Sequence, residues 1–447
     1  MSPQVLGLEQ PTTRHVPVDD FVPGTDGPLD SDWIKTLCRE AGAGDVGIVR
    51  ADHPDLGVDA REIRAFIPWA RSLIGIVCRM NRESIRSPAR SVANLEFHAA
   101  ADDVNETARE IVRRLEGLGI RALNTSVGFP MEMDRFPGKI WIISHKLVAV
   151  AAGLGRMGIH RNVIHPKFGS FILLGTIAVD RAVSACSAPI DFNPCVECKL
   201  CVSACPVGAI GAGGEFNFSA CYNHNYREFM GGFTNWVETV ADARDRYAYR
   251  ESVKDAESAS MWQSLSFGAN YKAAYCMSVC PAGADVIAPF LSDRPAFVQQ
   301  VVRPLQKKPE NVYVVKGSDA VEHVRKRFPQ KQIRIVPNGL RPTTIDGFIA
   351  GMPLTFQPAQ SGALDATYHF RFTGAECRDL TLSIRNSHLE LREGFKGKPD
   401  LRVTADSEFW IAFLRGEKHV LAGILTGRLR LKGRFTLLAE FGRCFPR

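Results

Sequence analysis

Residues 194–210 read PCVECKLCVSACPVGAI and carry four cysteines at the spacing C-x2-C-x2-C-x3-C-P. Three thiolates on one tight loop can bind three irons of a [4Fe–4S] cube, and the fourth cysteine reaches the other cluster where two are present. Zinc also suits four thiolates, but its cysteines usually come as two separated pairs. The stretch therefore predicts iron–sulfur ligands, namely Cys195, Cys198, Cys201 and Cys205.

The tail of a second such motif stands in residues 273–281, AAYCMSVCP. Cys276 and Cys280 keep the spacing, whereas Ala273 stands where the pattern has its first cysteine. Crossed ligation predicts that Cys280 completes the first cluster. The second cluster then has three predicted thiolates and lacks a fourth; the three are Cys205, Cys221 and Cys276.

His224 is a candidate for the missing fourth ligand, because it follows Cys221 by three residues in CYNHN. Rieske-type centres show that histidine can bind cluster iron. The alternative is a loop histidine with no ligand role. Cys186 is a second candidate, and the isolated cysteines are predicted to be buried as small hydrophobic residues; these are Cys38, Cys78, Cys377 and Cys444.

Length and composition describe a globular protein of two or three domains, since the 447 residues are 45% apolar and 23% charged. The net charge of +7 is spread along the chain, so no DNA-binding surface is indicated. No apolar run is long enough to span a bilayer. The first twenty residues lack the basic start and apolar stretch of a signal peptide, which predicts a cytoplasmic protein.

The residue patterns predict an α+β multidomain protein with five parts. These are an N-terminal tail (1–30), an α/β body (31–185), a ferredoxin module with an insertion (186–300), a small βαβ linker unit (305–342) and an α+β domain (343–447).

In the body, helices are predicted at 30–42 and 101–119, and strands at 72–78, 139–144 and 170–180. The second helix should bury one face, made of Val104, Ala108, Ile111, Val112, Leu115 and Leu118. A further helix is predicted in the insertion, at 235–247.

The linker unit is predicted as strand 311–315, a helix capped by Ser318, and strand 332–336. In the last hundred residues, period-2 alternation predicts half-buried antiparallel strands; these lie at 367–374, 380–384, 389–392, 401–405 and 427–433. A helix should begin after Asp406 and end before Gly416.

AAGLGRMGIHRN (151–162) contains the spacing G-x-G-x-x-G of dinucleotide-binding proteins. That motif needs a preceding strand and a long helix opening from it. Pro166 and Gly169 follow too soon for such a helix, so a nicotinamide site is not favoured.

Residues 151–180, followed by the cysteine motif, resemble the shared core of epoxyqueuosine reductases and corrinoid-dependent reductive dehalogenases. The resemblance covers roughly residues 32–300. It implies a base-off cobalamin held against two clusters, with electrons passing through the clusters to cobalt and an organic substrate being reduced. The residues implied to line the corrinoid are Gly153, Gly155, Gly158, His160, Arg161, Pro166, Gly169 and Ser170.

The chain departs from epoxyqueuosine reductases at the proton donor, an acid about thirteen positions before A-G-L-G. Lys139 occupies that position, and Asp134 lies five residues away from it. Both are candidate catalytic residues, since an acid is needed to protonate a leaving oxygen. The nearby basic residues could form either a solvated edge or an anion-binding surface; they are His145, His160, Arg161, His165 and Lys167.

The last hundred residues resemble the sterol-carrier-protein type lipid-binding fold in the order and spacing of YHFRFTGAE, LRVTADSEFWIAFLRGE and GRLRLKG. Such modules enclose an apolar tunnel between sheet and helices. Residues that could line a tunnel, or form an ordinary core, are Phe409, Trp410, Phe413 and Leu414.

The resulting hypothesis is a cytoplasmic iron–sulfur oxidoreductase that reduces a small organic or lipid-like substrate with electrons from a ferredoxin- or flavodoxin-type donor. The alternative is an electron-transfer or redox-sensing iron–sulfur protein whose C-terminal domain binds lipid. A third hypothesis is a lipid-binding module with a structural cluster.

Overall fold

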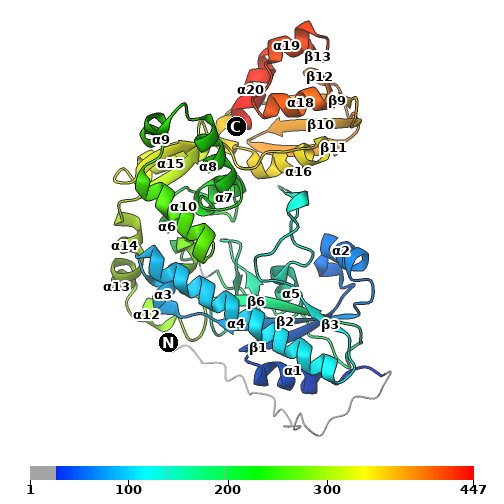
Figure 1. The fold of residues 1–447 in the computed structure, drawn as a ribbon, viewed down its shortest axis with the longest axis vertical. Helices are drawn as coiled ribbons and strands as arrows, with labels where there is room; N and C mark the ends of the chain where they lie inside the picture. Colours follow the sequence, from blue (N-terminus) through cyan, green and yellow to red (C-terminus); the bar gives the residue numbers. More distant parts are fainter. Residues whose placement is uncertain (1–26, 137, 196) are drawn as a thin grey trace, which may run out of the picture.

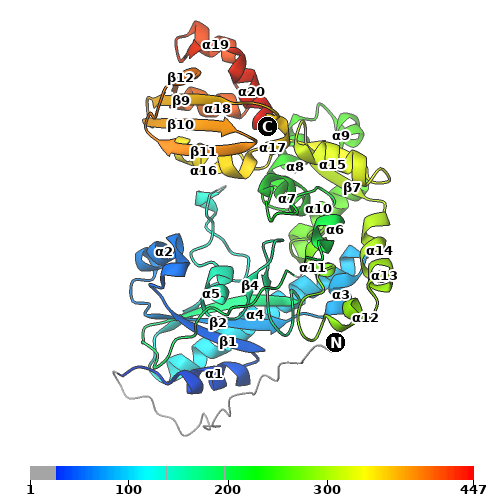
Figure 2. The same cartoon turned by 180° about the vertical axis from the view of Figure 1, so that it is seen from behind.

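The computed structural model describes residues 27–136, 138–195 and 197–447, so the predicted tail lies almost wholly outside the described residues. Figures 1 and 2 show the body and the C-terminal domain at opposite ends of the long axis. The helices of the cysteine-rich module and the small βαβ unit lie along one side between them. Among the described residues, no helix combines the length and the apolar character needed to cross a membrane.

The body is built on a four-stranded antiparallel sheet in the order β1-β2-β6-β3. The strands are β1 (Asp45–Arg50), β2 (Ser72–Arg79), β6 (Ile172–Val179) and β3 (Ala122–Asn124). Side chains alternate between the faces of β2, so Ile74 and Ile76 pack with α1 (Ser31–Glu40) and α4 (Arg90–Gly117). Leu73 and Val77 pack on the other face with α5 (His145–Ala151).

Both predicted helices of the body are present. Helix α1 begins where the Asp30 carboxylate accepts hydrogen bonds from the Asp32 and Trp33 N–H groups. Helix α4 begins at Arg90, well before the predicted residue 101, and its buried face includes Val104, Ile111 and Leu115. Leu118, predicted to lie on that face, is 39% exposed because the helix has already ended.

The strand predicted at 139–144 is wrong: the segment is an irregular loop. Ile140 and Ile143 are buried, as the apolar pattern suggests. The loop joins none of the sheets of the described chain, and Lys139 is instead tied to Asp59 of α2 (Val58–Phe66). The remaining short elements of the body are 3-10 turns Pro54–Leu56 and Met133–Arg135, helix α3 (Arg82–Arg86), and the hairpin of β4 (Arg156–Met157) with β5 (Val163–Ile164).

The cysteine-rich module is helical. The helices that carry its cysteines are α6 (Leu200–Ala204), α7 (Phe218–Asn225) and α11 (Tyr275–Ser278). The insertion forms α8 (Gly231–Asp242), α9 (Arg246–Ser252) and α10 (Asp255–Phe267), so the helix predicted at 235–247 is confirmed up to Asp242. Helices α12 (Ala288–Ser292), α13 (Arg294–Phe297) and α14 (Arg303–Lys307), with a π-helical turn at Val298–Val302, complete the module.

The small βαβ unit has the predicted order. Strands β7 (Asn311–Val315) and β8 (Gln332–Val336) are parallel and are joined by α15 (Asp319–Arg327). Val312, Val314 and Val324 share one hydrophobic core with the cysteine-bearing helices. The unit is therefore packed as part of the module rather than as a free linker.

The C-terminal domain is a five-stranded sheet in the order β11-β10-β9-β12-β13. Its elements are α16 (Ile345–Thr355), α17 (Pro358–Ser361), β9 (Ala366–Thr373), β10 (Arg378–Arg385), β11 (His388–Glu393), β12 (Leu401–Asp406), α18 (Ser407–Leu414), α19 (Val420–Leu425), β13 (Leu429–Gly433) and α20 (Thr436–Cys444). The five strands and the Asp406 cap of α18 are confirmed. The expectation of wholly antiparallel pairing is wrong, since the chain crosses over after β11 and β12 pairs with β9 in parallel.

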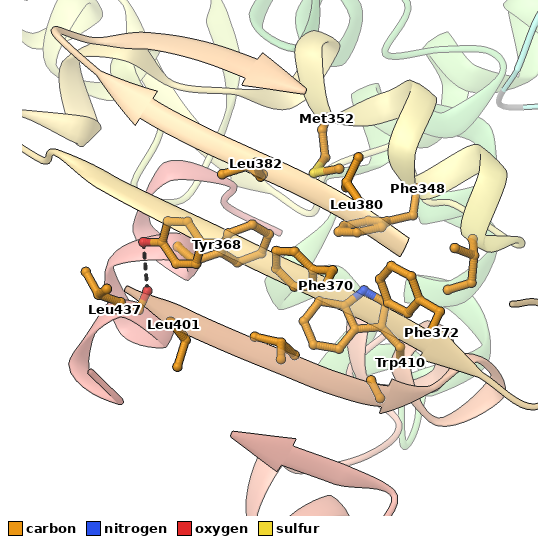
Figure 3. Packing of buried hydrophobic residues seen from close by; sticks show 14 of the residues in the cluster. Phe348, Met352, Tyr368, Phe370, Phe372, Leu380, Leu382, Leu401, Trp410 and Leu437 are labelled. Atoms are coloured by element: carbon orange, nitrogen blue, oxygen red, sulfur yellow. Dashed lines mark hydrogen bonds between the residues drawn. The ribbon is translucent and has the colours of Figure 1, made fainter. Parts of the chain in front are cut away.

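Aromatic side chains fill the space between this sheet and its helices (Figure 3). Phe370 and Trp410 pack with their ring centroids 5.5 Å apart, and the Tyr368 hydroxyl donates to the Leu437 carbonyl at 3.1 Å. Phe409 and Trp410 are buried in this core, and Phe413 and Leu414 pack against it. The prediction of buried isolated cysteines holds for three of the four, because Cys377 is exposed.

Phe370→Ala removes a fully buried ring from the centre of this core, so it should lower the free energy of unfolding by about 3–5 kcal/mol. Chemical denaturation followed by tryptophan fluorescence measures the loss. Phe435→Ala, at a ring 63% exposed, is the matched control and should change stability by about 0.5 kcal/mol or less. Equal losses in the two variants would show that the aromatic core does not carry the stability of the domain.

Candidate iron–sulfur centre

Four cysteines line one cavity at the boundary of the body and the module. They come from the loop before α6, from α6 itself and from the turn after α11; they are Cys195, Cys198, Cys201 and Cys280. The loop is tightly wound, because Glu197 and Lys199 have φ of 43° and 51°. Left-handed backbone at non-glycine residues is costly and typically marks a functional loop. We call these four cysteines the first thiol set. They are the residues predicted to bind the first cluster.

A second thiol set consists of Cys205, Cys221 and Cys276, which lie at the end of α6, in α7 and in α11. Removal from water raises the pKa of Cys276 to about 12, and the Cys205 thiol adds to this rise. Desolvation, followed by the Cys205 and Cys276 thiols, also raises the pKa of Cys221. The three thiols are therefore electrostatic neighbours and would be protonated until a metal displaces the protons.

One turn of the body reaches both thiol sets. The Ile159 N–H donates to Cys195 Sγ at 3.4 Å, and Asn162 Nδ2 donates to Cys276 Sγ at 3.8 Å. Lys146 Nζ is held nearby by the Arg161 carbonyl at 2.8 Å and by Asn162 Oδ1 at 3.2 Å. The Lys146 ammonium opposes the rise in the pKa of Cys276, so the body supplies a positive charge to the second set.

Hydrogen bonds hold both backbone groups of Ala273, the position where the motif lacks a cysteine. The Ala273 N–H donates to Asn225 Oδ1 at 3.0 Å, and its carbonyl accepts from Arg90 at 2.9 Å. Ala273 is buried in the same hydrophobic core as Cys205 and Cys276. A side chain at this position is therefore presented to the interior of the module.

His224 lies in helix α7 rather than in a loop, and its ring contacts Tyr313. Its Nδ1 accepts from the Tyr313 N–H at 3.3 Å, and its ring stacks on Tyr313. Burial lowers the pKa of His224 to about 4, against the opposing effect of the Glu310 carboxylate. Its Nε2 is buried and has no hydrogen-bond partner among the described residues, so the ligand role of His224 stays a prediction. Cys186, the other candidate, is exposed.

The glycines of 151–162 lie against protein. Helix α5 precedes them and the β4–β5 hairpin follows, which excludes the dinucleotide-binding arrangement. A methyl group added at Gly153, Gly155 or Gly169 would meet a backbone carbonyl oxygen; these oxygens belong to Ala188, Ile164 and Ala282. At Gly158 it would meet the Ile164 side chain at 2.7 Å. On the Cβ side of these glycines, protein atoms leave no room for a ligand.

The other residues predicted to line a corrinoid also contact the module. The Pro166 carbonyl accepts from the Ala284 N–H at 2.8 Å, and Ser170 Oγ donates to the Met277 carbonyl at 3.2 Å. Arg161 donates to the Gly214 carbonyl at 3.2 Å. The segment 153–170 thus holds the body and the module together.

His160 lines the cavity of the first thiol set. Its Nδ1 accepts from the Asn162 N–H at 3.2 Å, so the neutral ring carries its proton on Nε2, which has no partner among the described residues. Burial lowers the pKa of His160 to about 4. A buried N–H beside the thiols suits the sulfur atoms of a cluster.

Asp134 and Lys139 have different surroundings. Asp134 is exposed on the turn Met133–Arg135. Lys139 Nζ pairs with Asp59 Oδ1 at 2.8 Å and donates to the Ile142 carbonyl at 3.2 Å. Asp59 is buried, and sequence reasoning missed it because an aspartate in the first turn of a helix is ordinary.

The other basic residues do not form one anion-binding surface. His145 Nε2 donates to the Ser126 carbonyl at 2.9 Å, and His165 Nε2 donates to Asp45 Oδ2 at 3.0 Å. Lys167 is exposed. His145 and His165 are therefore structural. The interpretation as a solvated edge applies only to the exposed cations.

Cysteines at this sequence spacing suit clusters better than single ions. Within the described ranges, no three or more His, Cys, Asp or Glu side chains gather closely enough to hold one metal ion. Each cysteine of a cube binds a different iron, so the cysteine sulfurs stand further apart than around one zinc ion.

Residues 188–211 match the 4Fe-4S binding domain family, and residues 357–445 match the SCP-2 sterol transfer family. The chain carries an iron–sulfur domain.

Epoxyqueuosine reductases are similar to the chain. That of Staphylococcus aureus is 35% identical over 82 residues, which cover 18% of this chain and 20% of the relative. That of Gloeobacter violaceus is 27% identical over 182 residues, which cover 41% of this chain and 53% of the relative. The chain thus spans between a fifth and about half of the length of these curated relatives. The predicted resemblance is confirmed.

Solved structures of two kinds are also similar. Epoxyqueuosine reductase from Streptococcus thermophilus has 20% identity and a TM-score of 0.30, with 41% of this chain and 54% of that chain covered. The catabolic reductive dehalogenase NpRdhA has 17% identity and a TM-score of 0.38, with 61% and 34% covered. At such low similarity, the role of each residue has to be assigned from its own contacts.

Lys146→Met removes the cation beside the second thiol set, so it should lower the midpoint potential of a cluster bound there by on the order of tens of millivolts. A redox titration followed by electron paramagnetic resonance measures the potential. Lys167→Met, at an exposed lysine of the same region, is the control and should leave the potential unchanged. An unchanged potential in the Lys146 variant would place the ammonium outside the field of the cluster.

Proposed function

We propose that the protein is an iron–sulfur reductase that passes electrons through two clusters to an organic substrate. The observation that carries this proposal is the pair of thiol sets joined by one turn of the body. In this proposal Cys195, Cys198, Cys201 and Cys280 hold the first cluster, and Cys205, Cys221 and Cys276 hold the second. One iron of the second cluster then has no cysteine ligand, and His224 is not assigned to it because its Nδ1 already accepts from the Tyr313 N–H.

The clusters supply one-electron transfer at low potential. The chain's own residues neutralise the added negative charge: Lys146 stands beside the second set, and the guanidinium groups of Arg86 and Arg90 bind backbone carbonyls of the α11 region. The Ile159 N–H and the Asn162 amide stabilise thiolate sulfur by hydrogen bonds. These groups favour a reduced cluster without exposing it to water.

The substrate side is assigned to the face of the body that carries the Asp59–Lys139 ion pair. Exposed apolar side chains lie in the same loop region, namely Phe129, Met133 and Trp141. An acid and an ammonium group 2.8 Å apart can hold a proton for a leaving oxygen, while apolar side chains suit an organic or lipid-like substrate. No step is assigned to a corrinoid, because the glycines predicted to line it lie against protein on their Cβ side.

The electron donor is proposed to be a ferredoxin or flavodoxin, since the clusters need electrons at low potential. We assign the protein to the cytoplasm, where thiols stay reduced, because all twelve cysteines are free. The C-terminal domain is proposed to present a lipid-like substrate, as its match to the SCP-2 sterol transfer family suggests.

Cys280→Ser removes one ligand of the proposed first cluster and should lower the iron and sulfide content of anaerobically reconstituted protein by about half. Cys377→Ser is the matched control, because Cys377 is exposed in the C-terminal domain and should not affect iron. Loss of equal iron in both variants, or none in either, would contradict the ligand assignment. Reduction of a bound substrate by reduced ferredoxin then tests the reductase itself.

Because one iron of the second cluster lacks a cysteine ligand, the oxidised wild-type protein should show a three-iron signal. Ala273→Cys completes a four-cysteine second set, so the variant should lose that signal and show a [4Fe–4S] signal after reduction. Electron paramagnetic resonance distinguishes the two cluster types. Ala405→Cys, at a buried alanine of the C-terminal domain, is the control and should keep the wild-type spectrum. Identical spectra in the Ala273 variant would rule out an open iron.

A further inference from the structure

Helix α19 of the C-terminal domain turns its small residue inward and its large residues outward. Its glycine, Gly423, lies against the core, where a methyl group would meet Phe409 and Leu429. Its large aliphatic side chains point to solvent: Leu421 is 71% exposed, Ile424 44% and Leu425 87%. A surface helix normally buries its aliphatic stripe, so these residues form an exposed apolar ridge.

Positive charge surrounds this ridge. Between residues 415 and 434 the chain carries six Lys or Arg residues and one acid, Glu417. Lys418 precedes α19, Arg428 follows it, and Arg430 lies on the adjoining edge strand; all three are exposed. One of the six cations, Arg434, pairs with Asp400 at 3.9 Å. The other five have no ion pair among the described residues, so most of this charge is not neutralised within the chain.

The ridge also lies where a large flat partner could reach it. Figures 1 and 2 both place α19 at the outer tip of the C-terminal domain, on the side away from the body, and Figure 1 shows β13 beside it. A surface at such a tip can meet a membrane without the body or the module being in the way.

Three rival roles for the ridge each account for only part of the pattern. Cations on an edge strand prevent strand pairing between molecules, which would account for Arg430 but not for three exposed aliphatic side chains. A second copy of this chain would bring the same cations together and repel. Single-stranded nucleic acid is bound by aromatic stacking as well as charge, and the ridge is aliphatic.

We propose that this tip patch, made of Leu421, Ile424, Leu425, Lys418, Arg428 and Arg430, docks the protein on an anionic lipid surface. The aliphatic side chains enter the boundary between headgroups and acyl chains, and the cations contact headgroup phosphates and carboxylates. The α19 helix then lies in the plane of the membrane surface. The inference goes beyond the proposed reductase activity and does not depend on it.

Vesicle flotation with the full iron-loaded chain tests the proposal. The protein should float with phosphatidylcholine vesicles that contain about 30% phosphatidylserine, and added salt should release it. Vesicles of phosphatidylcholine alone should bind at least about tenfold less. No binding to the anionic vesicles, or equal binding to both kinds, would overturn the proposal.

Paired variants separate the two parts of the patch. Leu421→Gln with Leu425→Gln, and Arg428→Gln with Arg430→Gln, should each lower vesicle binding at least about tenfold. Leu265→Gln with Phe267→Gln, at side chains of α10 that are 55% and 69% exposed, is the matched control and should bind as the wild type does. All substituted side chains are exposed, and a thermal melt checks that each variant is folded.

Two further measurements identify the rival partners. If bulk transfer RNA binds and only the arginine variant loses it, while vesicles fail to bind, the patch is a nucleic-acid surface and the proposal is wrong. If sedimentation velocity shows a dimer that the leucine variant abolishes, the ridge is an interface between copies of the chain and the proposal is equally wrong.

Discussion

Close packing of backbone on backbone between residues 153–170 and residues 277–285 determines where the cluster region lies. Gly169 has φ of 66°, and a methyl group there would meet the Ala282 carbonyl. The Ala284 and Asp285 N–H groups donate to the carbonyls of Pro166 and Lys167, at 2.8 and 3.0 Å. Because Cys280 lies within this packed segment, the same contacts bring it to the loop that carries Cys195, Cys198 and Cys201.

The βαβ unit holds the same region from the other side. Lys331 is buried and pairs with Glu310 at 2.6 Å, and Glu310 accepts from the Tyr275 hydroxyl at 2.7 Å. Burial by itself would raise the pKa of Glu310, but Lys331, Tyr275 and Lys308 together outweigh it, so the pKa is lowered and the carboxylate stays ionised. A buried ion pair thereby ties the residue next to Cys276 to β7, and the unit acts as a clamp.

The cysteine spacing and the strands of the C-terminal domain can be predicted because both depend on local patterns. Period-2 alternation is strong where one face of a sheet is covered, and Asp406 caps its helix through its own side chain. The segment 139–144 has the apolar pattern of a strand but forms a loop, because such a pattern does not show whether a neighbouring strand is available for pairing. Helix α10 has no apolar stripe, so periodicity does not reveal it. The roles of Lys146, Asn162 and Asp59 depend on contacts across the fold, which spacing does not encode.

The order in which the chain is translated determines when its clusters can assemble. The strands of the body end at Val179, before the first cysteine of either thiol set, so the sheet can form while the module is still being translated. Neither set is complete until residues 276 and 280 have left the ribosome. Iron loading is therefore a late event on a scaffold that is already folded, and a chain truncated before residue 280 would keep a body but could not close its first cluster.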